Sequence, residues 1–269
     1  MSGQDRTPRL LRRGFLFYGC HVKLTISLLQ DLRSLRDGAR PAADIVVLPE
    51  LADGGYAALA DGQPPHTEGD SYLSSLQELS MKRDIVLVGG STRLKSRGGA
   101  CTNTSLTFHR GKCIHRYDKI HLFRPTGDHR YFVPGKKASV FRAAIGAHRL
   151  RIGVVICFDL RFPELMRSLA FRGMDLLIVP ARWPARRAEA WKTLLRARAI
   201  ENQAFVVGCN ASGIEGGPSF VFGPSGAPVP AIVRGNGTPA KRFTLDFDEI
   251  ARAKKLYDGV KEARWKRGR

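Results

Sequence analysis

Residues 153–164 read Gly-Val-Val-Ile-Cys-Phe-Asp-Leu-Arg-Phe-Pro-Glu, an apolar run that leads into a cysteine, a polar stretch and a proline. The pattern predicts a buried strand over 151–156 and a short helix over 163–172. A strand-to-helix turn of this kind presents one side chain, here Cys157, beside backbone N–H groups. A buried structural cysteine is the alternative, but the polar residues 159–161 argue against it. We therefore interpret Cys157 as a nucleophile.

The rest of the chain alternates strand-like and helix-like patterns in the same way. We predict further strands over 14–20, 44–48, 85–89, 101–110, 112–117, 175–180, 204–210 and 219–222. Apolar residues recur at helical spacing over 71–82 and 185–202, which predicts two more helices. No linker, repeat or low-complexity stretch interrupts this alternation. The sequence therefore indicates one α/β domain over 1–250, followed by a basic tail over 251–269.

The composition is that of a globular protein, with 43% hydrophobic residues among 269. No apolar run approaches the roughly 20 residues that span a bilayer. The run 14–20 follows two arginines, as in a signal peptide, but it is too short and is followed at once by His21 and Lys23. The five cysteines include no C-x-x-C pair, which predicts free thiols and no disulfide or zinc site. We expect a soluble, cytoplasmic protein without a metal or a membrane partner.

The charge is strongly positive, with 44 basic against 24 acidic residues and a net charge of +20. Such a balance can indicate a nucleic-acid partner. However, the basic residues are scattered, and no aromatic–basic RNA-binding motif is present. We therefore expect no nucleic-acid partner. The tail 251–269 concentrates eight basic residues, and we interpret it as a solvated segment or an anion-binding arm.

Two other segments bring charged side chains into apolar surroundings. Residues 46–50, Val-Val-Leu-Pro-Glu, place Glu50 after a buried strand, where open α/β sheets bind ligands. Residues 117–123, Tyr-Asp-Lys-Ile-His-Leu-Phe, place Lys119 among apolar neighbours. Buried lysines are rare and usually have a function. Taken singly, each segment also fits an ordinary surface residue, the lysine on an exposed edge strand.

Together the three residues form a mechanism. A thiol attacks an amide or nitrile carbon as the thiolate, so it needs a base, and Glu50 can serve as that base. Lys119 and the N–H of Phe158 can stabilise the oxyanion of the tetrahedral intermediate. Glu50 can then return the proton to the leaving amine and activate water. A Cys–His pair is the alternative, but His121, the one histidine in a motif, belongs to the lysine segment.

The three segments, in this order, resemble the signature of the nitrilase superfamily of carbon–nitrogen hydrolases. That signature is a Glu-Lys-Cys triad in contexts such as V-V-L-P-E, Y-D-K-x-H-L-F and C-x-D-x-R-F-P-E. The resemblance runs from about residue 13 to about residue 250. It includes further motifs at 89–91, 103–105, 197–203 and 217–226. Segments 157–164 and 182–202 look most like the omega-amidase branch, whose members hydrolyse small ω-amides of dicarboxylates such as 2-oxoglutaramate.

The resemblance implies a four-layer α-β-β-α sandwich and a homodimer that pairs the helices following the cysteine and lysine strands. It implies no metal and no cofactor. Three positions depart from the family pattern. Asp128 stands where a second glutamate is usual, Ala190 stands where a histidine often precedes Trp191, and Arg182 stands where a small or amide residue is common. Asp128 is one methylene shorter than glutamate, so its reach toward the triad is open.

Four arginines follow strand ends that should face the pocket, namely Arg161, Arg182, Arg186 and Arg187. Guanidinium groups bind carboxylates through two parallel hydrogen bonds. We therefore expect a small amide substrate with a carboxylate at its far end, with Arg161, Arg182 and Arg187 as its ligands. Alternatives are an N-carbamoyl amide hydrolase, a true nitrilase, or a non-enzymatic nucleic-acid-binding protein on this scaffold. The intact triad argues against the last.

Overall fold

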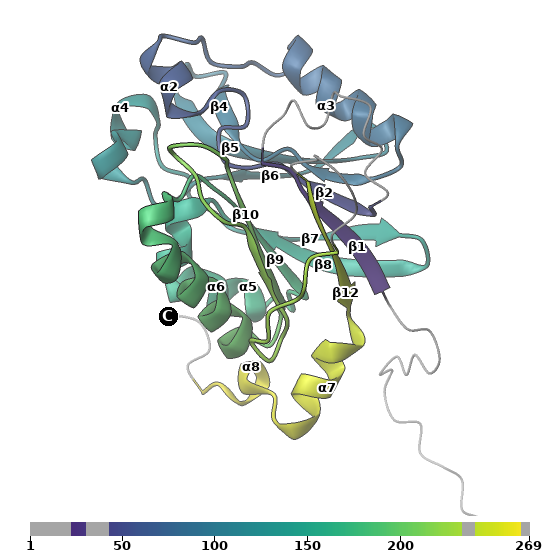
Figure 1. Cartoon of the computed structure of the whole chain (residues 1–269). Helices are drawn as coiled ribbons and strands as arrows, with labels where there is room; N and C mark the ends of the chain where they lie inside the picture. The colour runs from purple at the N-terminus through teal and green to yellow at the C-terminus, as the bar shows by residue number, and fades with distance from the viewer. Residues whose placement is uncertain (1–22, 31–42, 233–239, 265–269) are drawn as a thin grey trace, which may run out of the picture.

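Two β-sheets pack face to face in the computed structural model, which describes residues 23–30, 43–232 and 240–264 (Figure 1). The first sheet has the order β12-β1-β2-β3-β5-β4, with β6 paired to β5. Its strands are β1 (Lys23–Leu28), β2 (Ile45–Val47), β3 (Val86–Val88), β4 (Thr92–Lys95), β5 (Cys101–His109), β6 (Lys112–Asp118) and β12 (Lys241–Asp246). The second has the order β11-β10-β9-β8-β7. Its strands are β7 (Val140–Ile145), β8 (His148–Val154), β9 (Leu176–Ala181), β10 (Phe205–Asn210) and β11 (Phe220–Phe222).

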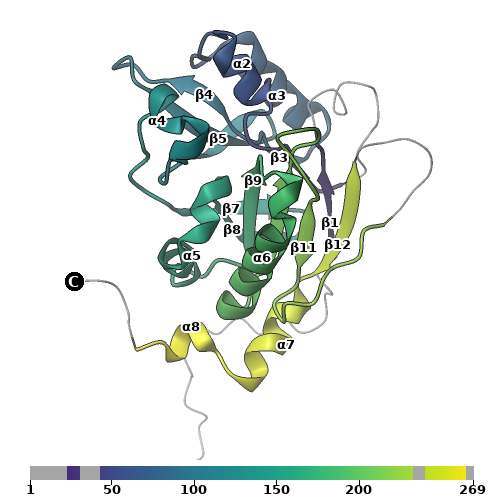
Figure 2. The ribbon, with the colours of Figure 1, turned by 60° about the vertical axis from the view of Figure 1, so that its left-hand side comes forward.

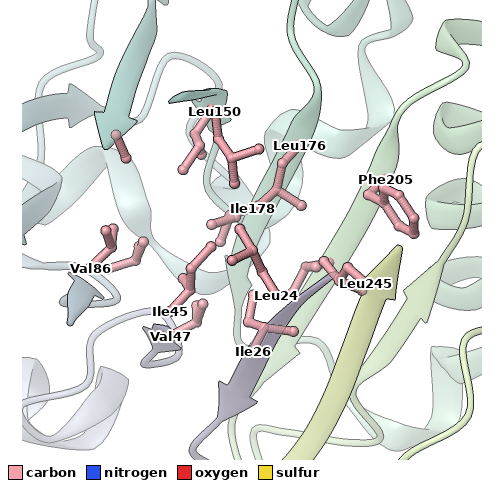
Figure 3. Close-up of a cluster of buried hydrophobic side chains, with 14 of the residues drawn as sticks. Leu24, Ile26, Ile45, Val47, Val86, Leu150, Leu176, Ile178, Phe205 and Leu245 are labelled. Carbon is pink, nitrogen blue, oxygen red and sulfur yellow. The ribbon is translucent and has the colours of Figure 1, made fainter. Parts of the chain in front are cut away.

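The side chains of the two sheets meet in one apolar core. Ile26 and Val47 of the first sheet pack in the same cluster as Ile152, Ile178 and Phe205 of the second, and all five are fully buried (Figure 3). Since side chains alternate between the two faces of a strand, the other face of each sheet needs a separate cover. Helices provide it.

Helix α3 (Ser71–Lys82) covers the outer face of the first sheet, where Leu76 packs with Val46 and Leu87. Helices α5 (Pro163–Ala170) and α6 (Ala188–Asn202) cover the outer face of the second sheet, and α6 lies along β10 and β11 (Figure 2). Leu177 and Val179 of β9 point to these helices, whereas Ile178 points to the other sheet. The architecture is therefore the four-layer α-β-β-α sandwich of the nitrilase type, as predicted.

Short helices lie at the two ends of the sandwich. Helices α2 (Gly55–Ala60) and α4 (Asp128–Tyr131) lie at one end, and α7 (Asp248–Leu256) and α8 (Gly259–Glu262) lie at the other. The domain boundary predicted between residues 250 and 251 falls inside α7, whose Ile250 packs against the inter-sheet core. Within the described ranges, no helix is both long and apolar enough to cross a membrane.

Most predicted elements are present, with their ends shifted by a few residues. Helix α3 has the predicted bounds, whereas β8 ends at Val154 because the chain already bends toward the cysteine. The predicted helix over 185–202 starts with a 3₁₀ turn over Ala185–Arg187. The strand predicted over 14–20 lies outside the described residues.

The parallel strands end at one edge of the sandwich. Strands β1, β2 and β3 run parallel in the first sheet, and β8, β9 and β10 run parallel in the second. Glu50 lies three residues after β2, Cys157 lies three residues after β8, and Arg182 directly follows β9. The fold therefore gathers the predicted residues from both sheets.

A histidine joins the loop after β2 to helix α3. His66 Nε2 lies 2.8 Å from Asp53 Oδ2, and His66 Nδ1 lies 2.5 Å from Asp70 Oδ2. Asp70 caps α3 by accepting a hydrogen bond from Leu73 N at 2.9 Å. The hydrogen bond to Asp53 raises the pKa of His66, with Asp70 adding to the shift and partial burial opposing it.

We predict that His66 stabilises the fold most at mildly acidic pH. Its folded pKa is raised above the unfolded value of about 6.5, so its contribution is fully present below about pH 6.5 and is lost as pH rises through the folded pKa. The difference in free energy of unfolding between wild type and His66→Gln should therefore shrink with rising pH. Urea unfolding across this range measures it, and a difference that stays constant with pH would contradict the prediction.

Candidate active site

Cys157 lies where strand β8 gives way to a 3₁₀ helix, Cys157–Arg161. Its φ of 47° is in the left-handed region, which non-glycine residues rarely occupy outside turns and functional sites. Buried Asp159 holds this turn, because its Oδ2 accepts hydrogen bonds from Ile156 N at 3.1 Å and Tyr117 Oη at 2.7 Å. The turn therefore fixes the thiol at the end of the strand, as the sequence predicts.

Glu50 is fully buried, and both of its carboxylate oxygens are hydrogen bonded. Oε1 accepts from Lys119 Nζ at 2.8 Å and from Asn103 Nδ2 at 3.0 Å. Oε2 accepts from the backbone N of Arg182 at 3.0 Å. Because a buried carboxylate is stable only when it is paired in this way, these contacts keep Glu50 in one orientation.

Lys119 is also buried, with 1% of its surface exposed, so the alternative of an exposed edge-strand lysine is wrong. Its Nζ donates to Glu50 Oε1 and to Asp128 Oδ2, both at 2.8 Å. Burial alone would lower the pKa of Lys119, but the attraction of Glu50, Tyr56, Cys157 and Asp128 raises it well above its usual value. The ammonium therefore stays charged.

Asp128 reaches Lys119 in spite of its short side chain. The chain turns through Gly127, with φ of 82°, and Asp128 begins helix α4. Asp128 Oδ2 accepts from Lys119 Nζ at 2.8 Å and from Phe123 N at 2.9 Å, while Oδ1 accepts from Tyr56 Oη at 2.7 Å. The backbone thus brings the carboxylate close enough to compensate for the missing methylene.

The thiol of Cys157 is a neutral group at rest. Burial and the nearby charge of Glu50 raise the pKa of Cys157 well above its usual value, with Lys119 acting in the opposite direction. Its Sγ lies 3.9 Å from the carbonyl oxygen of Arg182. Formation of a thiolate therefore requires a base and a nearby cation, and Glu50 and Lys119 are such groups.

A pocket of about 320 Å³ opens onto the thiol. Its wall combines aromatic, apolar and cationic side chains with one threonine and one glutamate: Tyr56, Phe123, Thr126, Cys157, Phe158, Arg161, Arg182, Trp183, Pro184, Arg186, Arg187, Ile214 and Glu215. The N–H of Phe158 lies in the first turn of the 3₁₀ helix, where N–H groups have no acceptor within the helix. It is therefore available to an oxyanion at Cys157.

The predicted arginines differ in what they contact. The Arg161 guanidinium carbon lies 5.0 Å from the Trp183 ring, and that of Arg187 lies 5.3 Å from the Phe123 ring. The guanidinium of Arg182, by contrast, donates to the carbonyl oxygens of Glu50 and Leu51. Cys157, Phe158 and the predicted arginines line the pocket, whereas Glu50, Lys119 and Asp128 are buried and do not. Arg182 is already bound to the chain, and its role as a substrate ligand stays a prediction.

Three residues of this site lay outside the predicted set. Tyr56 donates to Asp128, Asn103 donates to Glu50, and Glu215 pairs with Arg182. Asn103 lies in segment 103–105, one of the motifs that resemble the family, so the sequence did mark this residue. Glu215 is the one acidic residue in the glycine-rich stretch 212–217, a composition that indicates only a loop. Tyr56 carries no comparable signal.

A cysteine at a strand-to-helix turn, beside a buried Glu–Lys pair in a four-layer sandwich, defines a hydrolase that acts through a thiol. The profile of the family described as Carbon-nitrogen hydrolase matches residues 27–238. The chain therefore belongs to the carbon–nitrogen hydrolase family, within the nitrilase superfamily.

Individual relatives support this membership. The chain is 42% identical over 171 residues to an omega-amidase, YafV, of Yersinia enterocolitica, and the match covers 63% of this chain and 62% of that protein. It is 30% identical over 228 residues to the 2-oxoglutaramate amidase of Bacillus subtilis, which covers 82% of this chain and 86% of that protein. A crystal structure from Saccharomyces cerevisiae, of a branch 10 member of the nitrilase superfamily, is similar with a TM-score of 0.75 and 27% identity. That similarity covers 90% of this chain and 97% of the yeast chain.

We predict that Cys157 is the thiol whose alkylation abolishes activity. Cys157→Ala should keep the fold and lower the rate of amide hydrolysis by at least ~10³-fold, because the nucleophile is lost. Iodoacetamide treatment, peptide mapping and an ammonia-release assay test this. Cys113, which is exposed, provides the control: Cys113→Ser should retain both activity and inactivation by iodoacetamide. Full activity with Cys157 alkylated would contradict the prediction.

We predict that Asp128→Asn lowers kcat by about tenfold to a hundredfold, because Lys119 loses a charged acceptor and is drawn toward Glu50 alone. Asp128→Glu restores the charge, so it should recover more activity than Asp128→Asn. Steady-state kinetics with thermal unfolding as a control separates this effect from loss of fold. Equal activity of the two variants would show that the charge at this position is unimportant.

Proposed function

We propose that this protein hydrolyses the ω-amide of a small dicarboxylic acid through a thioester on Cys157, with release of ammonia. The observation that carries the proposal is the buried Glu50–Lys119–Asp128 cluster near Cys157, whose thiol faces a pocket lined in part by arginines. The omega-amidase and 2-oxoglutaramate amidase among the relatives support the same substrate class.

The first half-reaction forms the thioester. Glu50 takes the thiol proton while Cys157 Sγ attacks the amide carbon, and the C=O bond becomes an oxyanion. Lys119 Nζ and the N–H of Phe158 stabilise that oxyanion. When the oxyanion collapses, the C–N bond breaks and Glu50 gives its proton to the departing nitrogen, which leaves as ammonia.

The second half-reaction hydrolyses the thioester and regenerates the free enzyme. A water molecule enters where ammonia left. Glu50 takes a proton from this water while the water oxygen attacks the thioester carbon. The C–S bond then breaks, the thiolate recovers the proton from Glu50, and the dicarboxylic acid leaves. Lys119 stays charged throughout, so it balances the negative charge that moves among Glu50, the oxyanion and the thiolate.

Arg161 and Arg187 are suited to bind the far carboxylate of the substrate. The ring of Trp183 lies 5.0 Å from the guanidinium carbon of Arg161 and 6.0 Å from that of Arg187. Aromatic rings hold a guanidinium by cation–π attraction and leave its N–H groups free to bind a planar anion. A carboxylate between them would orient the amide toward Cys157.

We further propose that the protein is a cytoplasmic homodimer that pairs helix α5 with its copy. Met166 and Leu169 of this helix are buried within the chain, whereas Leu165 and Phe171 remain partly exposed. These two side chains provide apolar surface for a second copy. No cluster of metal-ligating side chains is found among the described residues, and independence from metal stays a prediction.

We predict that an ω-amide acid is hydrolysed about tenfold to a hundredfold faster, in kcat/KM, than its neutral methyl ester. A carboxylate bound to an arginine is worth roughly 1.5–3 kcal/mol. The preference should persist at high salt, which screens long-range attraction but not a bound pair. Arg187→Met should reduce the preference, whereas Arg149→Met, which removes an exposed charge outside the pocket, should not. Equal rates for acid and ester would overturn the carboxylate assignment.

A further inference from the structure

A closed series of hydrogen bonds surrounds the base of the pocket. Its members are six residues, each of which contacts the next: Glu50, Lys119, Asp128, Tyr56, Glu215 and Arg182. Four contacts join side chains, and two run from the backbone N–H groups of Tyr56 and Arg182 to carboxylates. We call this set the Glu50 ring. The inner half, from Glu50 to Tyr56, contains the proposed base and cation. The outer half, Arg182 and Glu215, has no role in the reaction described above.

The guanidinium of Arg182 is bound on three sides. Nε donates to the carbonyl oxygen of Glu50 at 2.8 Å, and one terminal nitrogen donates to the carbonyl oxygen of Leu51, also at 2.8 Å. The other terminal nitrogen donates to Glu215 Oε2 at 3.0 Å. The side chain of Arg182 is 13% exposed, so these contacts are largely shielded from water. Arg182 thus holds the backbone of Glu50 by its side chain and the carboxylate of Glu50 by its own N–H.

Glu215 completes this arrangement from a distant part of the chain. Its Oε2 accepts from Arg182 and also from the backbone N of Tyr56, at 3.3 Å. The same tyrosine donates its hydroxyl to Asp128. The Oε2 atom of Glu215 therefore links Arg182, which contacts Glu50, to the start of helix α2.

The backbone leaves room for this ion pair. Gly55 has φ of 76°, and a Cβ added there would lie 2.7 Å from both the Arg182 guanidinium and Glu215 Oε2. A side chain at this position would therefore collide with the pair. Helix α2 starts with a glycine that lets the pair lie directly against the backbone.

We propose that Arg182 and Glu215 are a positioning pair that fixes the base Glu50 against Cys157, and that Arg182 is not a ligand of the substrate carboxylate. This inference rests on the proposed function, in which Glu50 is the base. Arg182 fixes the main chain of Glu50 and Leu51, and Leu51 itself is held at φ of 44°. Glu215 balances the charge of Arg182, which leaves Arg161, Arg186 and Arg187 as the other arginines among the described residues that line the pocket.

Charge-changing variants distinguish positioning from substrate binding. Glu50 is surrounded by other ionisable groups: Lys119, Asp128, Cys157, Tyr56 and Arg182. Of these, Arg182 is the one that belongs neither to the inner half of the ring nor to the thiol. A neighbouring cation favours the ionised form of a carboxylate, and a neighbouring anion disfavours it. Arg182→Met and Glu215→Gln should therefore shift the acid limb of the pH–rate profile in opposite directions.

Arg182→Met is expected to lower kcat for the amide by at least about tenfold while KM changes by less than about threefold, because the base loses its support. The acid limb of kcat/KM should move to higher pH. Glu215→Gln keeps the shape of the side chain and should move the acid limb to lower pH. Arg151→Met is the matched control: Arg151 forms a similar paired contact with Asp175, at 3.0 and 2.9 Å, away from the pocket. It should shift neither limb.

The rate of Cys157 alkylation by iodoacetamide gives a second readout that needs no substrate. The pH profile of alkylation should move to higher pH in Arg182→Met and to lower pH in Glu215→Gln. If the wild type hydrolyses no amide, the proposed function fails, but the alkylation profile still tests the pair. If Arg182→Met does not fold, Glu215→Gln carries the test.

An Arg182→Met variant with raised KM and unchanged kcat would identify Arg182 as a substrate ligand and overturn the proposal. Unshifted profiles in the folded variants would overturn it as well.

Discussion

The ammonium of Lys119, buried between the carboxylates of Glu50 and Asp128, forms the interaction on which the site depends. A buried charge is costly unless it is paired and hydrogen bonded. Here the pairing is complete, since both partners lie at 2.8 Å and each carboxylate has further donors. This arrangement brings the loop after β2, which carries Glu50, against the connection between β6 and β7, which carries both Lys119 and Asp128. The strained turn at Cys157 is then placed against a cluster whose ammonium is already paired with two carboxylates.

The triad of Glu50, Lys119 and Cys157 could be read from the sequence because each of the three residues is marked by its neighbours. Glu50 and Cys157 follow apolar runs that form strands buried on both faces, and Lys119 stands in a short apolar segment. Each of these two residues follows the carboxyl end of a parallel strand, where α/β sheets bind ligands, but the strands belong to different sheets. Strand assignment therefore marks Glu50 and Cys157 singly, and the family resemblance is what groups them. The α/β class and the residues to examine followed from this local information, whereas the four-layer sandwich was implied by the family resemblance.

The remaining contacts could not be predicted, because they depend on how distant segments approach. Glu215 meets Tyr56 across 159 residues of sequence, and Arg182 meets Glu50 across 132. Whether Asp128 reaches Lys119 depends on the path of the turn through Gly127, not on side-chain length alone. The arginines near the pocket look alike in sequence. Which of them are already bound to the chain becomes clear only in three dimensions.

The two reacting side chains come from different sheets: Glu50 follows β2 of the first, and Cys157 follows β8 of the second. Their separation is therefore set by the thickness of the apolar layer between the sheets, in which Val47 and Ile178 pack together. That layer is a spacer as well as a core. Since interiors are close-packed and transmit strain, a change of volume there alters the distance over which a proton must move at the far edge. Side chains that never touch a substrate thus share in setting the chemical rate.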